Sequence, residues 1–304
     1  MLFIKDQNSI KFSEAGKLYL DYCELEKEMR PASIYEYSKT LKWTENILGD
    51  LVVQEINEEH IAELKKEYNR RELKPNTKAH NLSIIKELLR FCQDELHLQV
   101  MDFEKIKRPK IPKRRVEYLT EEELKQFFNS IGKKSTRDLR FRAFLSILIS
   151  TGCRIGEALH LHIADIDWDK KEAMIIGKGN KQRKIYFNSW SLKCIREYLK
   201  RRGYKYKFVL IGEQGRNLPW DRNDAQRSFR RYRRQAGMAE TVTAHTIRHS
   251  FATTLMKKNV SLGHIQVLLG HSDIQTTSRH YLGILSDDEA KQAYEKGMNM
   301  DSWL

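Results

Sequence analysis

A basic, proline-containing segment divides this chain of 304 residues into two regions. Between residues 105 and 115 there is no acidic side chain, and prolines stand at Pro109 and Pro112. Proline has no amide donor and biases the preceding residue towards extended backbone, so a helix does not continue through this segment. We therefore predict two domains joined by a linker. The expected boundaries are 1–104 for the first domain, 105–117 for the linker, 118–285 for the second domain and 286–304 for a tail helix.

The first region has the apolar periodicity of four short amphipathic helices. The first stripe begins at Phe12, and the second ends near Gly49, a residue suited to a helix C-terminus. Asn57 is placed to cap a third helix, and Pro75 stands where a fourth begins. Stripes of this kind are core-facing, so this region is expected to form a small helical bundle.

The second region combines helices with short strands. Thr120 begins a capping-box pattern, and an apolar helix over 141–150 runs into a turn at Gly152. Two strands are expected around a mobile, basic hairpin tip over residues 177–183. These two strands are expected at 173–176 and 184–187, a further buried strand at 208–211, and helices at 190–201 and 224–236. The predicted fold class is mainly α with a small β-hairpin or sheet: a four-helix bundle followed by a mixed α+β domain.

The balance of charge favours a polyanionic partner. The net charge is +14 and the estimated pI is 9.5, which makes nucleic acid the first candidate. Candidate DNA contacts lie in the linker and in the helix expected at 224–236. They are Lys107, Arg108, Lys110, Lys113, Arg114, Arg115, Arg227, Arg230, Arg231 and Arg234.

Cysteine usage and hydropathy indicate the compartment. Cys23, Cys92, Cys153 and Cys194 are widely scattered and match neither a zinc site nor a disulfide framework. The longest apolar runs are only a few residues, too short for a transmembrane helix. We therefore expect a cytoplasmic protein whose partners do not include a membrane, and one that is nucleoid-associated if its polyanionic partner is DNA.

Side chains suited to chemistry are dense between Ala244 and Tyr281. His245 and Arg248 stand three residues apart, so on a helix they share one face. Gly270 follows an apolar run where a helix C-terminal glycine belongs, and His271 then leaves the helix end. Each of these residues alone is more commonly a surface or core residue. Together, two imidazoles, a guanidinium and a phenol suit chemistry at an anion.

Five ordered sequence boxes extend this pattern through the second region. They are Arg154-x-x-Glu157, Gly177-Lys178-Gly179-Asn180-Lys181, His245-x-x-Arg248, Leu269-Gly270-His271, and Thr276-Thr277 before Tyr281. In order and spacing they resemble the catalytic boxes of tyrosine recombinases, the phage integrase family, including the chromosome-dimer-resolving type. The bundle at the N-terminal end resembles the family's core-binding domain. Five ordered boxes are far more specific than one short motif.

The resemblance implies a phosphate clamp. Arg154 and Arg248 correspond to the two arginines that hold the scissile phosphate, each able to bind its oxygens with two donors. His271 would donate a further hydrogen bond to those oxygens. Glu157 would orient Arg154 or a neighbouring histidine. Independently of the family, Arg154 is expected at a helix start, where backbone donors favour a nearby anion.

The resemblance also assigns the proton transfers. Tyr281 corresponds to the nucleophile, and an unperturbed phenol has a pKa of about 10, so it needs a base. His245 is the matched base, and Lys178 corresponds to the general acid that protonates the departing 5′ oxygen. The reaction implied is transesterification of double-stranded DNA through a 3′-phosphotyrosyl link. It requires no metal and no cofactor.

The family implies further partners as well. Self-association into a tetrameric synaptic complex on DNA is expected. A second recombinase or an accessory protein is a further possible partner by the same resemblance. The tail over 286–304 is expected to dock on a neighbouring protomer. The interval from His271 to Tyr281 departs from the family pattern, because it is one residue longer than usual.

Two other functions remain open at this stage. One is relaxation of supercoiled DNA by a type IB topoisomerase, which shares much of the catalytic set. The other is a DNA-binding regulator without catalysis. The filled catalytic positions argue against the regulator, and the glycine-flanked Lys178 and the Gly270-His271 box favour the recombinase.

Overall fold

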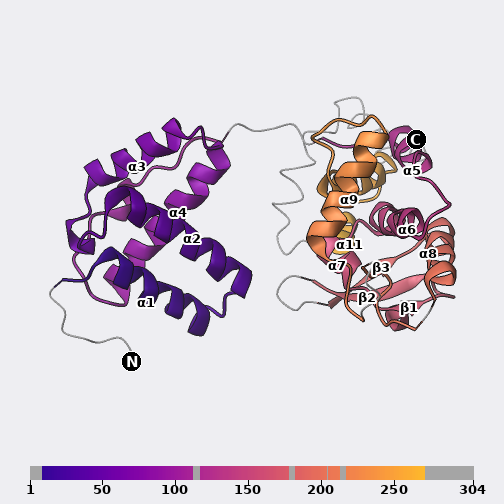
Figure 1. The fold of residues 1–304 in the computed structure, drawn as a ribbon, viewed down its shortest axis with the longest axis horizontal. Coiled ribbons are helices and arrows are strands. Elements are labelled where there is room, and N and C mark those ends of the chain that lie inside the picture. Colours follow the sequence, from indigo (N-terminus) through magenta and orange to yellow (C-terminus); the bar gives the residue numbers. More distant parts are fainter. Residues whose placement is uncertain (1–8, 112–116, 178–181, 204, 213–216, 271–304) are drawn as a thin grey trace, which may run out of the picture. The chain divides into compact units, whose positions relative to one another are not determined.

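The computed structural model describes residues 9–111, 117–177, 182–203, 205–212 and 217–270. The chain divides into two compact units, Met1–Arg114 and Arg115–Leu304. The described part is mostly helical, with a three-stranded sheet in the second unit (Figure 1). This confirms the predicted fold class. None of the described helices is both long enough and apolar enough to span a membrane.

The first unit is a bundle of helices that begin and end at the predicted signals. Asn57 caps α3, since its side chain accepts hydrogen bonds from the amides of Glu59 and His60 at 3.0 and 3.3 Å. Gly49 ends α2 with a positive φ of 79°. The elements are α1 Phe12–Leu25, α2 Pro31–Leu48, the 3₁₀ turn η1 Val53–Glu55, α3 Glu58–Arg70, α4 Pro75–Asp94 and the 3₁₀ turn η2 Phe103–Lys105.

The core of this unit reaches into the segment expected as linker. Ile106 is 3% exposed and packs in the same hydrophobic cluster as Tyr19 and Leu88. Just before it, Lys105 Nζ lies 2.8 Å from the Glu58 carboxylate. The packed part of the unit therefore continues through Ile106. Beyond it the basic side chains of Lys107, Arg108 and Lys110 are exposed, whereas Lys113, Arg114 and Arg115 lie outside the described residues.

The second unit is built around α6, a helix with buried residues on every side. Residues from Arg140 to Leu148 are all buried, so this stretch of α6 has no solvent-exposed polar face. It contacts α8 and α10. The helices are α5 Glu121–Asn129, α6 Thr136–Thr151, α7 Ile155–Leu159, α8 Ser189–Arg202, α9 Arg222–Gln235, α10 Ala244–Lys257 and α11 Leu262–Leu269.

The sheet is antiparallel in the order β1-β2-β3, with β1 Ile166–Asp167, β2 Glu172–Ile176 and β3 Gln182–Tyr186, and it follows the 3₁₀ turn η3 Ile163–Asp165. Ala173 and Ile185 pair with each other and face the core. Met174 and Tyr186 point outwards and are exposed. The sheet thus presents one apolar face to α6, which it contacts through β3.

The prediction of a strand at 208–211 was wrong, although all four residues are buried as expected. Phe208 makes an isolated bridge with His162, and Ile211 makes another with Pro219. Because the two bridges go to different segments, no ladder forms along this stretch.

Candidate functional site

Four elements meet at the carboxyl end of α6. That end is closed by Gly152, which has a left-handed φ of 60°. A Cβ at this position would lie 2.3 Å from the Phe251 ring of α10, so only glycine lets the two helices approach this closely. The chain then turns at once into α7, and Arg154 occupies its N-cap position. Arg248 comes from the middle of α10, and Gly270 ends α11.

Arg248 is a buried cation held by backbone carbonyls. Its side chain is 3% exposed, and its Nη1 and Nη2 donate to Gly152 O at 2.8 Å and to Leu269 O at 2.6 Å. Burial, followed by the nearby charge of Arg154, lowers its pKa to about 10. Arg248 therefore stays charged at neutral pH and ties the end of α6 to the end of α11.

Arg154 reaches the same place from α7. Its Nη2 lies 3.4 Å from Gly270 O, and its Nη1 donates to Glu157 Oε1 at 3.0 Å. Arg154 and Arg248 thus bond to the carbonyls of two adjacent residues, Leu269 and Gly270. The structure brings together the two guanidinium groups that the sequence placed in a phosphate clamp. Arg154 is the more accessible of the two, with 37% of its side chain exposed.

Glu157 occupies the centre of the cluster and is engaged on both oxygens. It accepts from the Arg154 amide at 2.7 Å, from Arg154 Nη1, and from Arg183 Nη1 and Nη2 at 2.8 Å each. Burial alone would raise its pKa, but these hydrogen bonds outweigh burial and the pKa is lowered. The Arg154 amide, one of the backbone donors at the start of α7, is therefore taken by the chain's own carboxylate.

Arg183 is a member of this cluster that the sequence interpretation missed. The prediction placed it at the end of a mobile hairpin tip, and this was wrong. Arg183 lies in β3 with 11% of its side chain exposed, and its Nε lies 3.3 Å from Leu268 O. The available signal was strand alternation, because Arg183 stands two residues before the buried Ile185 and so shares its face.

His245 lies in the first turn of α10, three residues before Arg248. It is exposed, whereas Arg248 is buried, and its ring packs edge-on against His249 with centroids 4.5 Å apart. His245 and Arg248 stand about one turn apart on α10. The solvent-accessible imidazole of His245 therefore lies beside the buried guanidinium of Arg248. A general base must be reachable by the group whose proton it accepts, and the exposure of His245 meets this requirement.

Several predicted site residues lie outside the described residues. These are Lys178, His271 and Tyr281, together with the tail over 286–304. Their neighbours in the sequence are described. The last β2–β3 pair, Ile176 with Gln182, is the base of the hairpin that carries Lys178, and Gly270 immediately precedes His271.

Four arginines line the outer surface of α9. Arg227, Arg230, Arg231 and Arg234 are all exposed, as their candidate role in DNA contact requires. Arg233 differs from them, because it is 5% exposed and donates to the carbonyls of Glu240 and Val242. The helix thus combines an inward face with an arginine-rich outer face.

The cluster has an excess of positive charge suited to a phosphodiester. Arg154, Arg183 and Arg248 surround one carboxylate, that of Glu157, among the described residues. Guanidinium groups bind phosphate oxygens through two parallel donors, and fixed cations stabilise charge that grows during phosphoryl transfer. Within the described chain, no group of three or more His, Cys, Asp or Glu side chains is placed to bind a metal ion.

Comparison with known proteins agrees with the fold. Residues 117–286 match the model of the phage integrase family, and residues 17–95 match its N-terminal SAM-like domain. The chain belongs to the phage integrase family of tyrosine recombinases.

Individual relatives span most of the chain. The tyrosine recombinase XerC of Haemophilus influenzae (strain PittEE) is 28% identical over 265 residues, which cover 85% of this chain and 89% of that protein. XerC of Myxococcus xanthus is 31% identical over 216 residues, covering 68% and 71%. Among solved structures, a lambda integrase tetramer bound to a Holliday junction has a TM-score of 0.71 at 19% identity, covering 89% of this chain and 80% of that one.

Proposed function

We propose that this chain is a site-specific DNA recombinase that cuts and rejoins double-stranded DNA through a 3′-phosphotyrosyl intermediate on Tyr281. One observation carries the proposal. The guanidinium groups of Arg154 and Arg248 converge on the carbonyls of Leu269 and Gly270, directly before His271. Membership of the phage integrase family supports the same reaction.

The arginines supply the electrostatic part of catalysis. In-line attack by Tyr281 builds negative charge on the non-bridging oxygens of the scissile phosphate. Arg154, which is accessible, and Arg248, which is buried and held by two carbonyls, are already in place when that charge develops. Such preorganised donors are worth about 10²–10³ in rate each. His271 adds a hydrogen bond to the same oxygens.

Two residues move protons in this proposal. His245 accepts the phenolic proton of Tyr281, for which its exposure on α10 is suited. Lys178 protonates the departing 5′ oxygen from the tip of the β2–β3 hairpin. The phosphotyrosyl link then conserves the bond energy, and the 5′ hydroxyl of a partner strand reverses the reaction without an external energy source.

The rest of the chain is assigned to DNA binding and assembly. The basic segment after Ile106 and the exposed arginines of α9 contact phosphates, which makes affinity strongly dependent on salt. We propose a tetramer on DNA, because the lambda integrase relative forms one on a Holliday junction. The tail over 286–304 docks on a neighbouring protomer, and the protein is cytoplasmic and nucleoid-associated.

The test uses labelled, nicked DNA duplexes drawn from a library of candidate sites. The wild-type protein should form a covalent adduct that survives denaturation, and Tyr281→Phe should form none. Adducts that persist in Tyr281→Phe and vanish in Tyr294→Phe would move the nucleophile to Tyr294. Relaxation of a supercoiled plasmid without site preference would instead support a type IB topoisomerase activity and overturn site-specific recombination.

A further inference from the structure

A buried hydrogen bond ties the segment that enters the second unit to α10, the helix of Arg248. The amide of Leu119 donates to Ser250 Oγ at 2.8 Å. Ser250 is 0% exposed and Leu119 is 7% exposed, so this bond lies in the interior. The same hydroxyl donates to Thr246 O in the first turn of α10 at 2.9 Å. One side chain therefore connects the entering segment to the catalytic helix.

Two further contacts join this segment to the carboxyl end of α10. Lys257 Nζ lies 5.0 Å from the centroid of the Tyr118 ring, and Lys258 Nζ lies 2.6 Å from the Glu121 carboxylate. Both lysines are exposed, and exposed ion pairs contribute little because solvent screens them. The buried bond to Ser250 is therefore the link that solvent weakens least.

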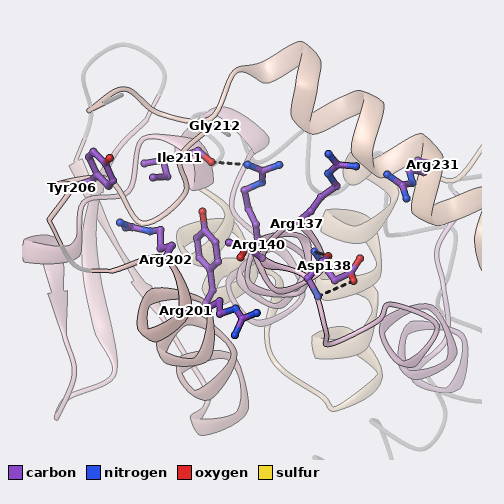
Figure 2. A pocket seen from close by; sticks show the side chains of 12 residues that line it. Arg137, Asp138, Arg140, Arg201, Arg202, Tyr206, Ile211, Gly212 and Arg231 are labelled. Carbon is purple, nitrogen blue, oxygen red and sulfur yellow. Dashed lines mark hydrogen bonds between the residues drawn. The ribbon is translucent and has the colours of Figure 1, made fainter. Parts of the chain in front are cut away.

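α10 packs against α6, and α6 is held at its amino end by other parts of the chain. Arg140 Nη1 donates to Ile211 O at 3.0 Å, as the dashed line in Figure 2 shows. Asp138 Oδ1 accepts the hydroxyl of Tyr232 from α9 at 2.6 Å. These bonds do not involve α10, so α6 provides a frame against which α10 is placed.

Ser250 and Arg248 lie on nearly opposite sides of α10. Two residues along an α-helix correspond to about 200° of rotation and about 3 Å of rise. On its own side, Arg248 donates to Gly152 O at the end of α6 and to Leu269 O at the end of α11. α10 is thus held between the entering segment and the phosphate clamp, and a shift at Ser250 reaches Arg248 through a rigid helix.

The basic linker that precedes Leu119 is a segment to which the proposed function assigns DNA contacts. Its described side chains Lys107, Arg108 and Lys110 are exposed. Lysine and arginine side chains bind DNA phosphates without regard to sequence, and such contacts fix the protein's register on the duplex. A linker bound to DNA therefore fixes the chain just before it reaches Leu119.

We propose that Ser250 is a positioning residue through which a DNA-bound linker sets Arg248 at the scissile phosphate. The inference rests on the proposed function, because the linker lysines must contact DNA for the coupling to operate. Ser250 accepts the amide of Leu119, so a linker held on phosphates holds α10 in place. Cleavage is then fastest where the linker is fully engaged, which adds a requirement for correct docking before the strand is cut.

A double-mutant cycle measured by single-turnover cleavage of a nicked duplex tests the coupling. Ser250→Ala removes the acceptor, and a linker variant with Lys107→Gln and Lys110→Gln removes two charges. At saturating DNA, each is expected to slow cleavage about tenfold, the loss of roughly one hydrogen bond. The combined variant should also be about tenfold slower than wild type, not a hundredfold, because both changes interrupt one connection.

A buried serine of α6 provides the matched control. Ser146 is 0% exposed as well, but its hydroxyl donates to Ala143 O at 2.8 Å inside its own helix. Ser146→Ala should leave cleavage within a few fold and should not change the effect of the linker variant. Ser250→Thr keeps the hydroxyl and should retain the dependence on the linker lysines. Thermal unfolding establishes that each variant is folded, and Ser250→Cys, a weaker acceptor, replaces Ser250→Ala if that variant does not fold.

Hydrogen exchange supplies a second readout that needs DNA binding but no cleavage. Exchange in the peptide that contains Leu119 should slow when wild type binds DNA and should slow less in Ser250→Ala, where the amide has lost its acceptor. Equal slowing in both proteins would overturn the coupling.

The cleavage results separate this inference from the proposed function. Losses that multiply in the combined variant would leave Ser250 with a role in stability alone and overturn the proposal. Wild-type cleavage by the linker variant at saturating DNA would do the same, since the linker would then serve binding only. If wild type forms no adduct on any duplex, the proposed function is overturned, and this inference is overturned with it.

Discussion

Arg183 and Glu157 form a buried, two-pronged ion pair that joins β3 to α7. Arg183 Nη1 lies 2.8 Å from Glu157 Oε1, and Nη2 lies 2.8 Å from Oε2. The same carboxylate bonds to Arg154, and Arg183 Nε approaches Leu268 O in α11. One side chain thus links the hairpin that carries Lys178, the helix start that carries Arg154 and the helix end before His271. We assign Arg183 as a positioning residue for all three.

Replacing Arg183 should destabilise the fold and slow DNA cleavage together. Arg183→Gln leaves the Glu157 carboxylate buried without its main partner, and breaking a buried pair in this way costs about 3–5 kcal/mol. Denaturant unfolding measures this cost. Single-turnover cleavage of a nicked duplex should fall while DNA affinity changes little, because Arg183 acts through Arg154 and not on the DNA.

The neighbouring Lys184 provides the control for this prediction. It also lies in β3 and pairs with a glutamate, Glu172, but its side chain is 50% exposed. Lys184→Gln should therefore change the free energy of unfolding little and leave cleavage unchanged. Arg183→Lys should restore part of the stability but less of the cleavage rate, since lysine cannot form the two parallel hydrogen bonds of a guanidinium group. Equal effects of Arg183→Gln and Lys184→Gln would remove the positioning role.

The lowered pKa of Glu157 predicts how stability depends on pH. A carboxylate whose pKa is depressed on folding adds stability above its unfolded pKa of about 4.3, and this is lost as pH falls through the lower, folded value. The unfolding free energies of wild type and Glu157→Gln should differ most near neutral pH and converge in acid. Urea unfolding at a series of pH values from neutral to acid measures the difference, and a gap independent of pH would contradict the assignment.

Local signals in the sequence predicted most helix ends correctly. Asn57 and Thr120 cap α3 and α5, and Gly152 and Gly270 end α6 and α11 in the left-handed conformation. Each of these signals depends on residues within one turn of the helix end, so the sequence alone contains it.

The features that we did not predict from the sequence depend mainly on contacts between residues far apart in the chain. The burial of Arg183 requires Glu157, which is 26 residues away, and no local pattern encodes that pairing. The start of α6 was predicted at Phe141, yet the helix begins at Thr136 because Ser135 caps it through the Asp138 amide at 3.0 Å. The first turn of α6 is polar, so the apolar pattern did not mark this start. Strand β1 has only two residues, too few to show the alternation of a strand.

Arg248 should not tolerate replacement by lysine. The guanidinium group bridges Gly152 O and Leu269 O, two acceptors that a single ammonium group cannot hold in the same geometry. Arg248→Lys is expected to lower the single-turnover cleavage rate by about 10²–10³ while DNA affinity stays within a few fold. Gel-shift and cleavage assays on the same duplex separate the two quantities. Cleavage at the wild-type rate would exclude Arg248 from the phosphate clamp.

A methyl group at Gly270 should disturb the site through Arg183. Gly270 has a φ of 64°, and a Cβ there would lie 2.7 Å from Arg183 Cδ and 2.9 Å from its Nε. Gly237, after α9, has a similar φ of 66° but nothing within 4 Å of the added atom. Both Gly→Ala changes incur the left-handed strain of about 1–2 kcal/mol, so their difference isolates the contact with Arg183.

Gly270→Ala should therefore lower the cleavage rate, whereas Gly237→Ala should lower stability alone. The decisive measurement repeats Gly270→Ala in an Arg183→Ala background, where the obstructing side chain is gone. Because both changes act on one contact, the double variant should lose less cleavage activity than the sum of the single losses predicts. Strict additivity would show that Gly270→Ala acts by backbone strain alone and not through its contact with Arg183.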